Sequence, residues 1–459
     1  MPIQFPRILY APLLVVVLVS LATPSRAATQ RQPDLPLRFD VSGSFRTRYG
    51  YLWNQFRPAA PGNDGALALR TTLLAELGSN AIGAGIEIAD SRIYLADDNA
   101  PLGTSHVNPL DVLQVYVSAE IPDLLADGSN LRMKLGRQTM DVGSRRFVAR
   151  NRFRNTINSR TGLDLAWTGP NRNSVRAFLT VPVQRRVQSI PDNDPQLDIE
   201  RTESVFWGVV LGSGTWKHGV HAALQVYGIH ERDSDEYQTR NRNFMTPGLR
   251  VLRDPKPNLI DFEIESVVQV GTSRRTSLPD DLSDLNHRAF FAHLALGYTI
   301  PGNWHPRLVV QYDYASGDED PTDDSNGRFD TLYGARRFEY GPTGIYGAFA
   351  RTNVNTPGLR VEFAPRTGVS GFVSYRSVWL AQARDAWTTT GLVDLDGLSG
   401  KHLGHQLEGS LRWQILPENM RFETGFARVW YGNFPKSTTD SDPSPKNPLF
   451  LYTQLTVQF

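Results

Sequence analysis

Arginine is the residue type whose placement in this sequence most suggests chemistry. Six arginines fall between Asp141 and Asp164, and no acidic side chain lies between those two positions. They are Arg145, Arg146, Arg150, Arg152, Arg154 and Arg160. A guanidinium keeps its charge at every physiological pH and can hold a carboxylate through two parallel hydrogen bonds. The stretch therefore predicts an anion-binding segment, whose role depends on the elements that hold it.

Two strands are expected to flank this basic segment. Apolar and basic side chains alternate over residues 131–136, and apolar side chains alternate with Asp164 over residues 163–167. Arg137 departs from the pattern, because an unbroken strand would turn it toward the apolar side. We expect either that the strand ends near Gly136 or that a bulge re-aims Arg137.

The same alternation recurs along most of the chain. From Leu37 to Tyr51 one face is apolar and the other carries arginines and hydroxyls. Similar segments are 67–77, 82–88, 112–119, 175–183, 220–228, 290–300, 307–314, 359–363, 369–381, 407–415, 420–426 and 449–459. Tight links alternate with long polar loops at 231–257, 316–341 and 433–448. Such strands predict an all-β, transmembrane antiparallel β-barrel with short periplasmic turns and long extracellular loops, rather than secreted β-sandwiches.

The two ends of the chain agree with export to the outer membrane of a Gram-negative bacterium. Residues 1–27 have a positive start at Arg7, a short apolar run and a small-x-small site ending at Ala27, which is typical of a cleaved signal peptide. Residues 28–459 are then one barrel domain. The final alternating strand ends on Phe459, the kind of terminal aromatic that the barrel-assembly machinery reads.

Overall charge does not indicate a nucleic-acid partner. The full chain carries +1, and removing Arg7 and Arg26 with the signal leaves −1. Any preference for anions must therefore come from local placement. The expected surroundings are outer-membrane lipid, and no cofactor is expected.

An ordered set of motifs resembles the alginate-export family of outer-membrane barrels. The matching residues are Gly136-Arg137-Gln138, Gly143, Arg146, Arg154-Asn155-Thr156 and Asp164, then 314–318, Pro321, 329–334 and 351–353, and finally Gly404-His405, Gly425 and Phe434. Phe153 stands where the family usually has tryptophan. The resemblance implies an eighteen-stranded barrel, with sixteen strands as the alternative by strand count. It also implies passage of an anionic polysaccharide or a smaller acidic solute.

Strand parity and the basic segment together supply candidate pore-lining cations. They are Arg46, Arg48, Arg70, Arg132, Lys134, Arg137, Arg146, Arg152, Arg154, Arg176, Arg360 and Arg376. A ring of such groups in a narrow pore lowers the barrier to anions. Parity also turns acids such as Glu87 inward, so cross-strand pairing that stiffens the wall is the alternative role. If the basic segment lies outside the barrel, its arginines would instead bind lipid phosphates.

Calcium binding and hydrolysis are two further functions that the sequence could suggest. Asp318, Asp320 and Asp323 could bind calcium, although their spacing is not that of an EF-hand and a solvated loop is the alternative. A barrel hydrolase would need a base such as His221 or His293 beside a lumenal serine, and no catalytic motif accompanies them. We therefore predict a non-enzymatic channel.

Overall fold

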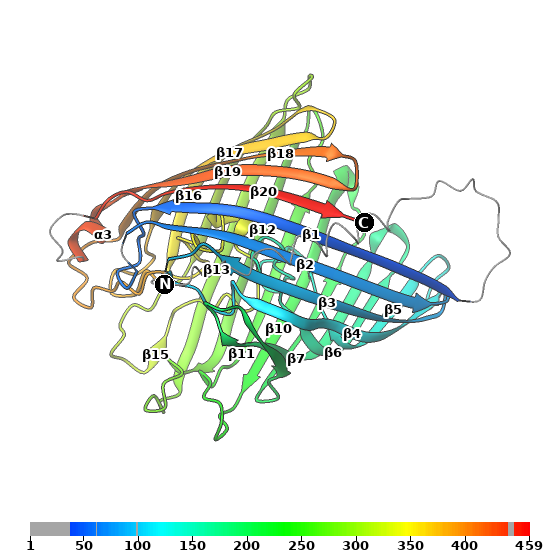
Figure 1. Ribbon diagram of the computed structural model, residues 1–459, viewed down its shortest axis with the longest axis horizontal. Helices are drawn as coiled ribbons and strands as arrows, with labels where there is room; N and C mark the ends of the chain where they lie inside the picture. Colours follow the sequence, from blue (N-terminus) through cyan, green and yellow to red (C-terminus); the bar gives the residue numbers. More distant parts are fainter. Residues whose placement is uncertain (1–36, 61, 98–99, 439–444) are drawn as a thin grey trace, which may run out of the picture.

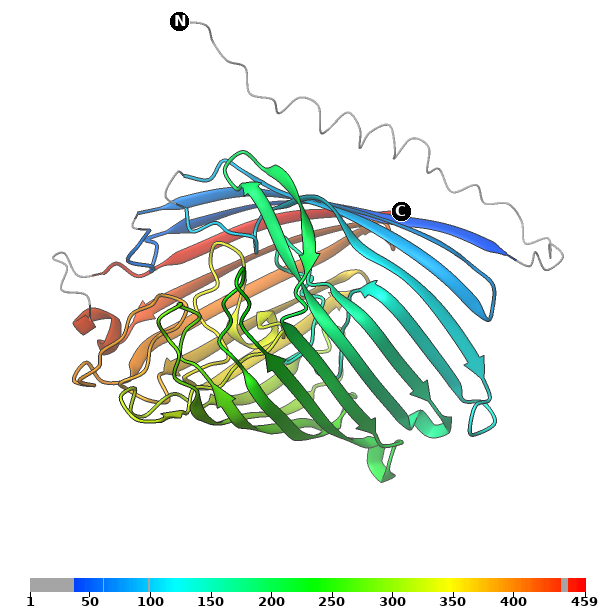
Figure 2. The same ribbon diagram turned by 90° about the horizontal axis from the view of Figure 1, so that it is seen from below.

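The computed structural model describes residues 37–60, 62–97, 100–438 and 445–459, so the predicted signal peptide lies outside the described residues. Eighteen antiparallel strands close into a barrel, because β1 pairs with β2 on one side and with β20 on the other (Figures 1 and 2). The predicted fold class and strand number are confirmed. Around the wall the strands are β1 (Arg38–Trp53), β2 (Asp64–Gly78), β3 (Ile82–Tyr94), β4 (Asn108–Pro122), β5 (Asn130–Gln138), β6 (Arg160–Thr168), β7 (Ser174–Ser189), β9 (Ser204–Gly212), β10 (Val220–Glu231), β11 (Asn243–Arg253), β12 (Ile260–Ser273), β13 (Leu285–Thr299), β14 (Arg307–Ala315), β16 (Val354–Arg366), β17 (Val369–Trp379), β18 (His402–Leu416), β19 (Met420–Tyr431) and β20 (Leu449–Gln458).

The two ends of the barrel differ in the length of their connections. Residues 79–81, 367–368 and 417–419 make tight turns at the end where β1 begins and β20 finishes. The opposite end carries long connections, among them residues 95–107, 139–159, 316–353 and 380–401. This asymmetry agrees with the sequence, and it identifies the short-turn end as periplasmic.

Each strand is amphipathic, with an apolar outer face and a polar inner face. Phe39, Val117 and Leu135 are more than half exposed on the outside, whereas Arg46 and Glu265 are buried inside. Because side chains alternate between the faces of a strand, this pattern separates a lipid-facing surface from a polar lumen. In the part of the chain that the structure describes, no helix is long and apolar enough to cross a membrane.

Three wall strands were missed by the sequence analysis. They are β9, β11 and β12, and β11 lies within residues 231–257, which were expected to be one long loop. Pro247 and Gly248 sit in the middle of β11, where proline cannot donate a ladder hydrogen bond and glycine adds no packing surface. Those two residues masked the strand.

Two of the long loops turn into the barrel. The first inward loop (residues 139–159) connects β5 to β6, and the second inward loop (residues 316–353) connects β14 to β16. They pair with each other, since Ala149 N–H donates to Tyr333 O and Tyr333 N–H donates to Phe147 O, at 3.2 and 3.0 Å. The short β15 (Ser325–Asn326) and α2 (Arg337–Tyr340) lie in the second inward loop.

The apolar core of the protein sits where these loops meet the wall. Phe147 from the first inward loop and Phe329 from the second are 1% exposed, and both pack against Phe291 of β13 at ring-centroid distances of 5.9 and 5.5 Å. A polar barrel thus contains a small apolar centre, which holds the inward loops as a packed unit.

Another excursion extends from the wall at its long-loop end. The end of β7 pairs with β8 (Asp194–Glu200) as a hairpin that projects beyond the barrel strands and packs against β4 (Figure 2). A last short helix, α3 (Asn433–Thr438), follows β19 near the long-loop end.

Candidate functional site: the channel lumen

The first inward loop is held inside the barrel by two neighbouring arginines of the wall. Arg46 of β1 and Arg70 of β2 are cross-strand partners. Arg46 donates to the carbonyls of Arg152 and Phe153, both at 3.0 Å, and Arg70 donates to Arg152 O at 3.1 Å and Arg154 O at 3.0 Å. Like charges facing each other would destabilise the sheet, but here the carbonyl dipoles of the loop offset the repulsion. Neither guanidinium pairs with a carboxylate within the described ranges.

The Arg154-Asn155-Thr156 motif fixes the position of this loop against the wall. Asn155 Nδ2 donates to the carbonyls of Arg92 and His106, at 3.1 and 2.9 Å, and Ser91 Oγ donates to Asn155 O at 3.0 Å. Arg154 hydrogen-bonds to Asn158. Burial, together with the like charges of Arg185 and Arg336, lowers the pKa of Arg154 well below its ordinary value. Among the described residues Arg154 forms no ion pair.

Phe153 takes the place of the usual tryptophan as an aromatic platform. The Arg48 guanidinium lies 3.8 Å from the centre of its ring, and that of Arg337 lies 4.9 Å away. Tyr452 of β20 meets the ring edge-on at 5.5 Å. A phenyl ring can offer this cation–π contact as an indole does, so the departure from the family pattern keeps the geometry.

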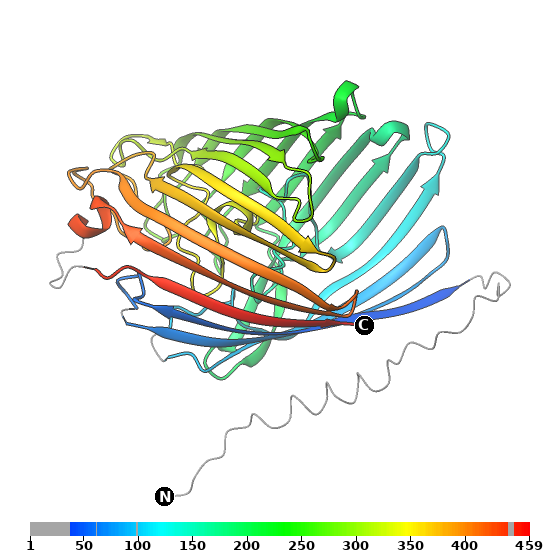
Figure 3. The ribbon, with the colours of Figure 1, turned by 90° about the horizontal axis from the view of Figure 1, so that it is seen from above.

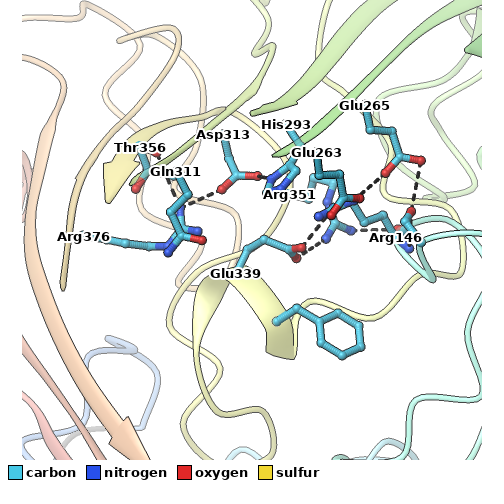
Figure 4. A network of polar contacts seen from close by, with 12 residues as sticks. Arg146, Glu263, Glu265, His293, Gln311, Asp313, Glu339, Arg351, Thr356 and Arg376 are labelled. Carbon is cyan, nitrogen blue, oxygen red and sulfur yellow. Dashed lines mark hydrogen bonds and ion pairs between the residues drawn. The ribbon is translucent and has the colours of Figure 1, made fainter. Parts of the chain in front are cut away.

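Arg146 ties the first inward loop to a distant part of the wall (Figure 4). Its guanidinium contacts Glu263 and Glu265 of β12, the latter at 2.6 Å, and Glu339 of the second inward loop at 3.0 Å. Burial alone would lower the pKa of Arg146, yet the three carboxylates hold it well above its ordinary value. Arg351 completes the cluster, donating to Glu339 and to Arg146 O, both at 2.7 Å.

The first inward loop therefore spans the lumen. It is bonded to β1 and β2 through Arg46 and Arg70 and to β12 through Arg146. In an eighteen-stranded wall β1 and β12 stand nearly opposite each other. The alternative that this basic segment lies on the outer surface is wrong.

Several of the predicted pore cations form ion pairs with carboxylates in the wall. Arg176 holds both oxygens of Asp164 at 2.9 Å, and Arg360 pairs with Glu362 at 2.8 Å. Arg376 binds Asp313 at 2.7 Å, and the other oxygen of Asp313 contacts His293 Nδ1 at 2.6 Å (Figure 4). For these arginines the stiffening role applies.

This arrangement gives the hydrolase alternative no support. His293 is buried and, among the described residues, its only hydrogen-bond partner is Asp313, not a serine hydroxyl. His221 lies beside Asp254 and the exposed hydroxyl of Thr215, each at 3.5 Å, near the short-turn end, and neither of these is a lumenal serine. Neither histidine activates a nucleophile.

A cavity of about 680 Å³ lies on the periplasmic side of the inward loops. Its cationic lining consists of nine arginines: Arg46, Arg48, Arg70, Arg145, Arg150, Arg152, Arg337, Arg412 and Arg421. Its lining includes only three carboxylate side chains, those of Glu87, Asp141 and Glu423. The lumen at this level is therefore strongly positive, although the whole chain is nearly neutral.

The sheet register arranges part of this lining as a row. Arg421 of β19 and Arg46 of β1 both face Thr456 of β20, and Arg70 of β2 faces Arg46 on the other side. Three arginines thus lie at one level on neighbouring strands. Arg412 of β18 extends the basic surface and pairs with Glu423 at 2.9 Å.

The predicted site residues divide into three groups. Arg46, Arg48, Arg70 and Arg152 line the cavity, whereas Arg146, Arg154, Arg176, Arg360 and Arg376 do not. Arg132 and Lys134 share the inner face of β5 outside the cavity lining, and Lys134 lies 3.5 Å from the Tyr116 ring centre. Arg337 was missed, because it lies in the second inward loop, where no strand alternation indicates direction.

The pore-lining assignment of Arg137 is wrong. The register of β5 with β4 and β6 is unbroken through Gln138, and Arg137 faces Val115, which is exposed on the outer face. Neither a strand end at Gly136 nor a bulge occurs. Instead, Glu200 of the β7–β8 hairpin covers the side chain, with an ion pair of 2.8 Å. Arg137 holds that hairpin against the outside of the wall.

The acidic loop shows no calcium site. Within the described residues, no three His, Cys, Asp or Glu side chains are placed to hold a metal ion. Asp318 contacts Arg275 at 3.4 Å, Asp320 accepts from Thr322, and Asp323 accepts from Ser325. These carboxylates are used for local turns and for ion pairs, since Asp323 also lies 3.8 Å from Arg275 and Asp320 lies 3.9 Å from Arg384.

Comparisons with known proteins agree with this architecture. The chain matches the family model described as Alginate export over residues 38–445, and no curated protein matches it. Pseudomonas aeruginosa OccK9 (OpdG) has a TM-score of 0.58 at 12% identity, covering 92% of this chain and 98% of that one. Pseudomonas aeruginosa OpdQ has a TM-score of 0.54 at 14% identity, covering 92% and 97%. Acinetobacter baumannii OccAB2 has a TM-score of 0.56 at 12% identity, covering 92% and 98%.

Identities this low show only that these solved structures share the barrel fold. The family match, in contrast, extends over most of the chain. The protein thus belongs to the alginate export family, and it is a porin-like channel of the Gram-negative outer membrane rather than an enzyme.

Proposed function

We propose that this channel passively conducts anions, carrying an acidic polysaccharide of the alginate type or smaller acidic solutes. The observation that supports this most directly is the lumenal cavity with nine arginines and three carboxylate side chains. Fixed charge of one sign in a low-dielectric passage concentrates counter-ions and lowers their barrier to entry.

Some of the arginines in the cavity are free to bind a solute, which also supports the proposal. The Arg152 side chain is 71% exposed, and its one ion-pair contact, with Asp141, is a weak surface pair. Arg145 and Arg421 form no ion pair with any described residue, and Arg145 lies 4.3 Å from the Phe338 ring centre. A carboxylate entering the cavity therefore meets guanidiniums that have bonding capacity left.

Passage through neighbouring arginines suits a repeating polyanion. Arg421, Arg46 and Arg70 occupy three strands at one level, so their charges combine into a positive band on this side of the lumen. Arg46 and Arg70 are bonded to carbonyls of the first inward loop, so they attract a carboxylate through their field, whereas the exposed Arg152 can bind it directly. Conduction requires such binding to be shared among several sites rather than concentrated in one. The same row serves a small acidic solute equally well.

Reversal potentials in planar bilayers test the anion preference. The wild-type channel is expected to pass chloride in preference to potassium, and Arg152→Glu is expected to lower that permeability ratio by about threefold, because it reverses a charge in the cavity. Arg152→Lys keeps the charge and is expected to keep the ratio. Arg137→Ala, on the outer face, is the second control. Cation preference in the wild type, or equal ratios in Arg152→Glu and Arg152→Lys, would contradict the proposal.

We also propose that Phe459 is recognised by the barrel-assembly machinery. Its backbone is bonded to Gly43 of β1 in both directions, at 2.9 and 3.2 Å, where the first and last strands close the barrel. An aromatic residue at the seam that closes the barrel supports a role in assembly.

A further inference from the structure

A group of cations lies on the outer face of the wall near its long-loop end. We call Lys401, His402, His405 and Arg428 the outer cationic patch. Across β18 and β19, His405 faces Trp430 and Leu407 faces Arg428. Trp430 is exposed on the outside, and so is Tyr375 of β17, which pairs with Leu407. Figure 3 shows β16 to β19, from yellow to red-orange, side by side on this face. The patch therefore faces outward, toward lipid.

Aromatic side chains tie the patch together. Tyr375 Oη and His405 Nδ1 are 2.8 Å apart, and the two histidine rings are 4.9 Å apart. Trp379 lies 5.2 Å from His402, and Arg428 lies 5.3 Å from the Trp430 ring centre. Tyrosine and tryptophan concentrate where a barrel passes from hydrocarbon to head groups. The patch is thus at the level of the outer-leaflet head groups.

The register irregularity at the start of β18 brings the two histidines to one side. The pairing of β17 with β18 shifts between Val378 and Trp379, and Gly404 has a φ of 139°. Residues three apart would otherwise face opposite sides of a strand. The bulge therefore concentrates positive and titratable side chains that a regular strand would separate.

The patch differs from two other outward cations, Arg92 and Arg137, in lacking carboxylate partners. Arg92 pairs with Asp90 at 3.0 Å, and Arg137 pairs with Glu200. None of the four patch residues forms an ion pair within the described part of the chain. Lys401 Nζ donates instead to Ala381 O at 2.6 Å and to Gln382 Oε1 at 3.4 Å, which leaves one of its three protons for a ligand.

A groove adjoins the patch on the same face. It measures about 430 Å³ and is lined by Lys401 together with Tyr312, Pro357 and Trp379. We propose that the outer cationic patch and this groove bind the phosphorylated head group of an outer-leaflet lipid. Lys401 lines the groove, whereas Arg428 faces Leu407, six residues further along the chain, so each donates charge-assisted bonds to a different phosphate of the head group. The aromatic side chains contact the sugar or the first acyl carbons.

Native mass spectrometry of the full-length mature barrel in detergent tests this site, with diphosphoryl lipid A and the same glycolipid without phosphates as probes. The wild type is expected to bind the phosphorylated lipid roughly tenfold more tightly, and the double variant Lys401→Ala/Arg428→Ala is expected to lose most of that difference. Arg288→Ala removes an outward arginine of β13, which faces the exposed Val270, and is the matched control.

Three binding results would contradict the lipid site. Equal binding of both lipids by the wild type, an unchanged difference in the double variant, or an equal loss in Arg288→Ala would overturn the proposal. Heat-dependent gel mobility checks that each variant is folded, and Lys401→Ala alone replaces the double variant if that fails to fold. Competition by inorganic phosphate to completion would show an anion site without a lipid requirement and would also overturn it.

Discussion

Arg146→Ala is expected to raise the single-channel conductance several-fold and to weaken the barrel's resistance to unfolding. Arg146 is the ion-pair partner shared by Glu263, Glu265 and Glu339, and it is buried with them. Removing one partner of a buried ion cluster leaves uncompensated charge and costs about 3–5 kcal/mol. Water must enter to solvate the three carboxylates. The first inward loop loses its ion pairs to β12 and keeps the bond of 3.0 Å from Ser144 Oγ to Glu265.

Planar-bilayer conductance and thermal unfolding measure the two effects. Arg146→Lys is the matched replacement, because it keeps the charge but cannot direct separate N–H groups to β12 and to Glu339. It is expected to fall between the wild type and Arg146→Ala. Arg152→Ala, in the same loop but exposed, controls for any arginine loss. Unchanged conductance in Arg146→Ala would mean that the loop stays in place without Arg146, through Phe147 packing and the bonds from Arg46 and Arg70.

The barrel could be predicted from the sequence because its cause is local. Alternation over residues 37–51 reports the lipid face and the lumen face directly, and it correctly turns Arg46 and Arg48 inward. The same rule correctly turned Arg137 outward. The error there was to doubt parity, since an arginine facing lipid is costly; the hairpin strand β8, whose Glu200 neutralises it, lies 63 residues further along the chain.

The roles of the arginines could not be predicted, because their partners are distant in sequence. Arg146 and Arg152 share one loop and one residue type, yet one is enclosed by three carboxylates and the other is exposed. Glu263 and Glu339 are 117 and 193 residues from Arg146. Nothing in the basic segment itself indicates those contacts, so local sequence identifies an arginine-rich loop but not which charges remain available.

Asp330 is expected to be the acid-sensitive anchor of the second inward loop. Its carboxylate lies 3.1 Å from Arg242 and 3.4 Å from Arg240, and it accepts the Leu332 N–H at 2.8 Å. Its backbone exchanges two hydrogen bonds of 2.9 Å with Gln269 of β12, which also contacts His287 at 3.2 Å. Burial alone would raise the pKa of Asp330, but the charges of Arg242 and Arg240 and the Leu332 bond lower it to about 2.

A carboxyl group with a lowered pKa stabilises the fold above its unfolded pKa and loses that contribution as pH falls through its folded pKa. For Asp330 the contribution is fully present above about pH 4, amounts to about 2 kcal/mol, and disappears as pH falls toward about 2. Asp330→Asn is expected to lose the same free energy at pH 7 and to lose less further stability between pH 4 and pH 2 than the wild type. Thermal unfolding at pH 7, 4 and 2 measures both, and Asp324→Asn, at an exposed position of the same loop, is the control. Parallel pH curves for the wild type and Asp330→Asn would show that another acid controls the docking of this loop.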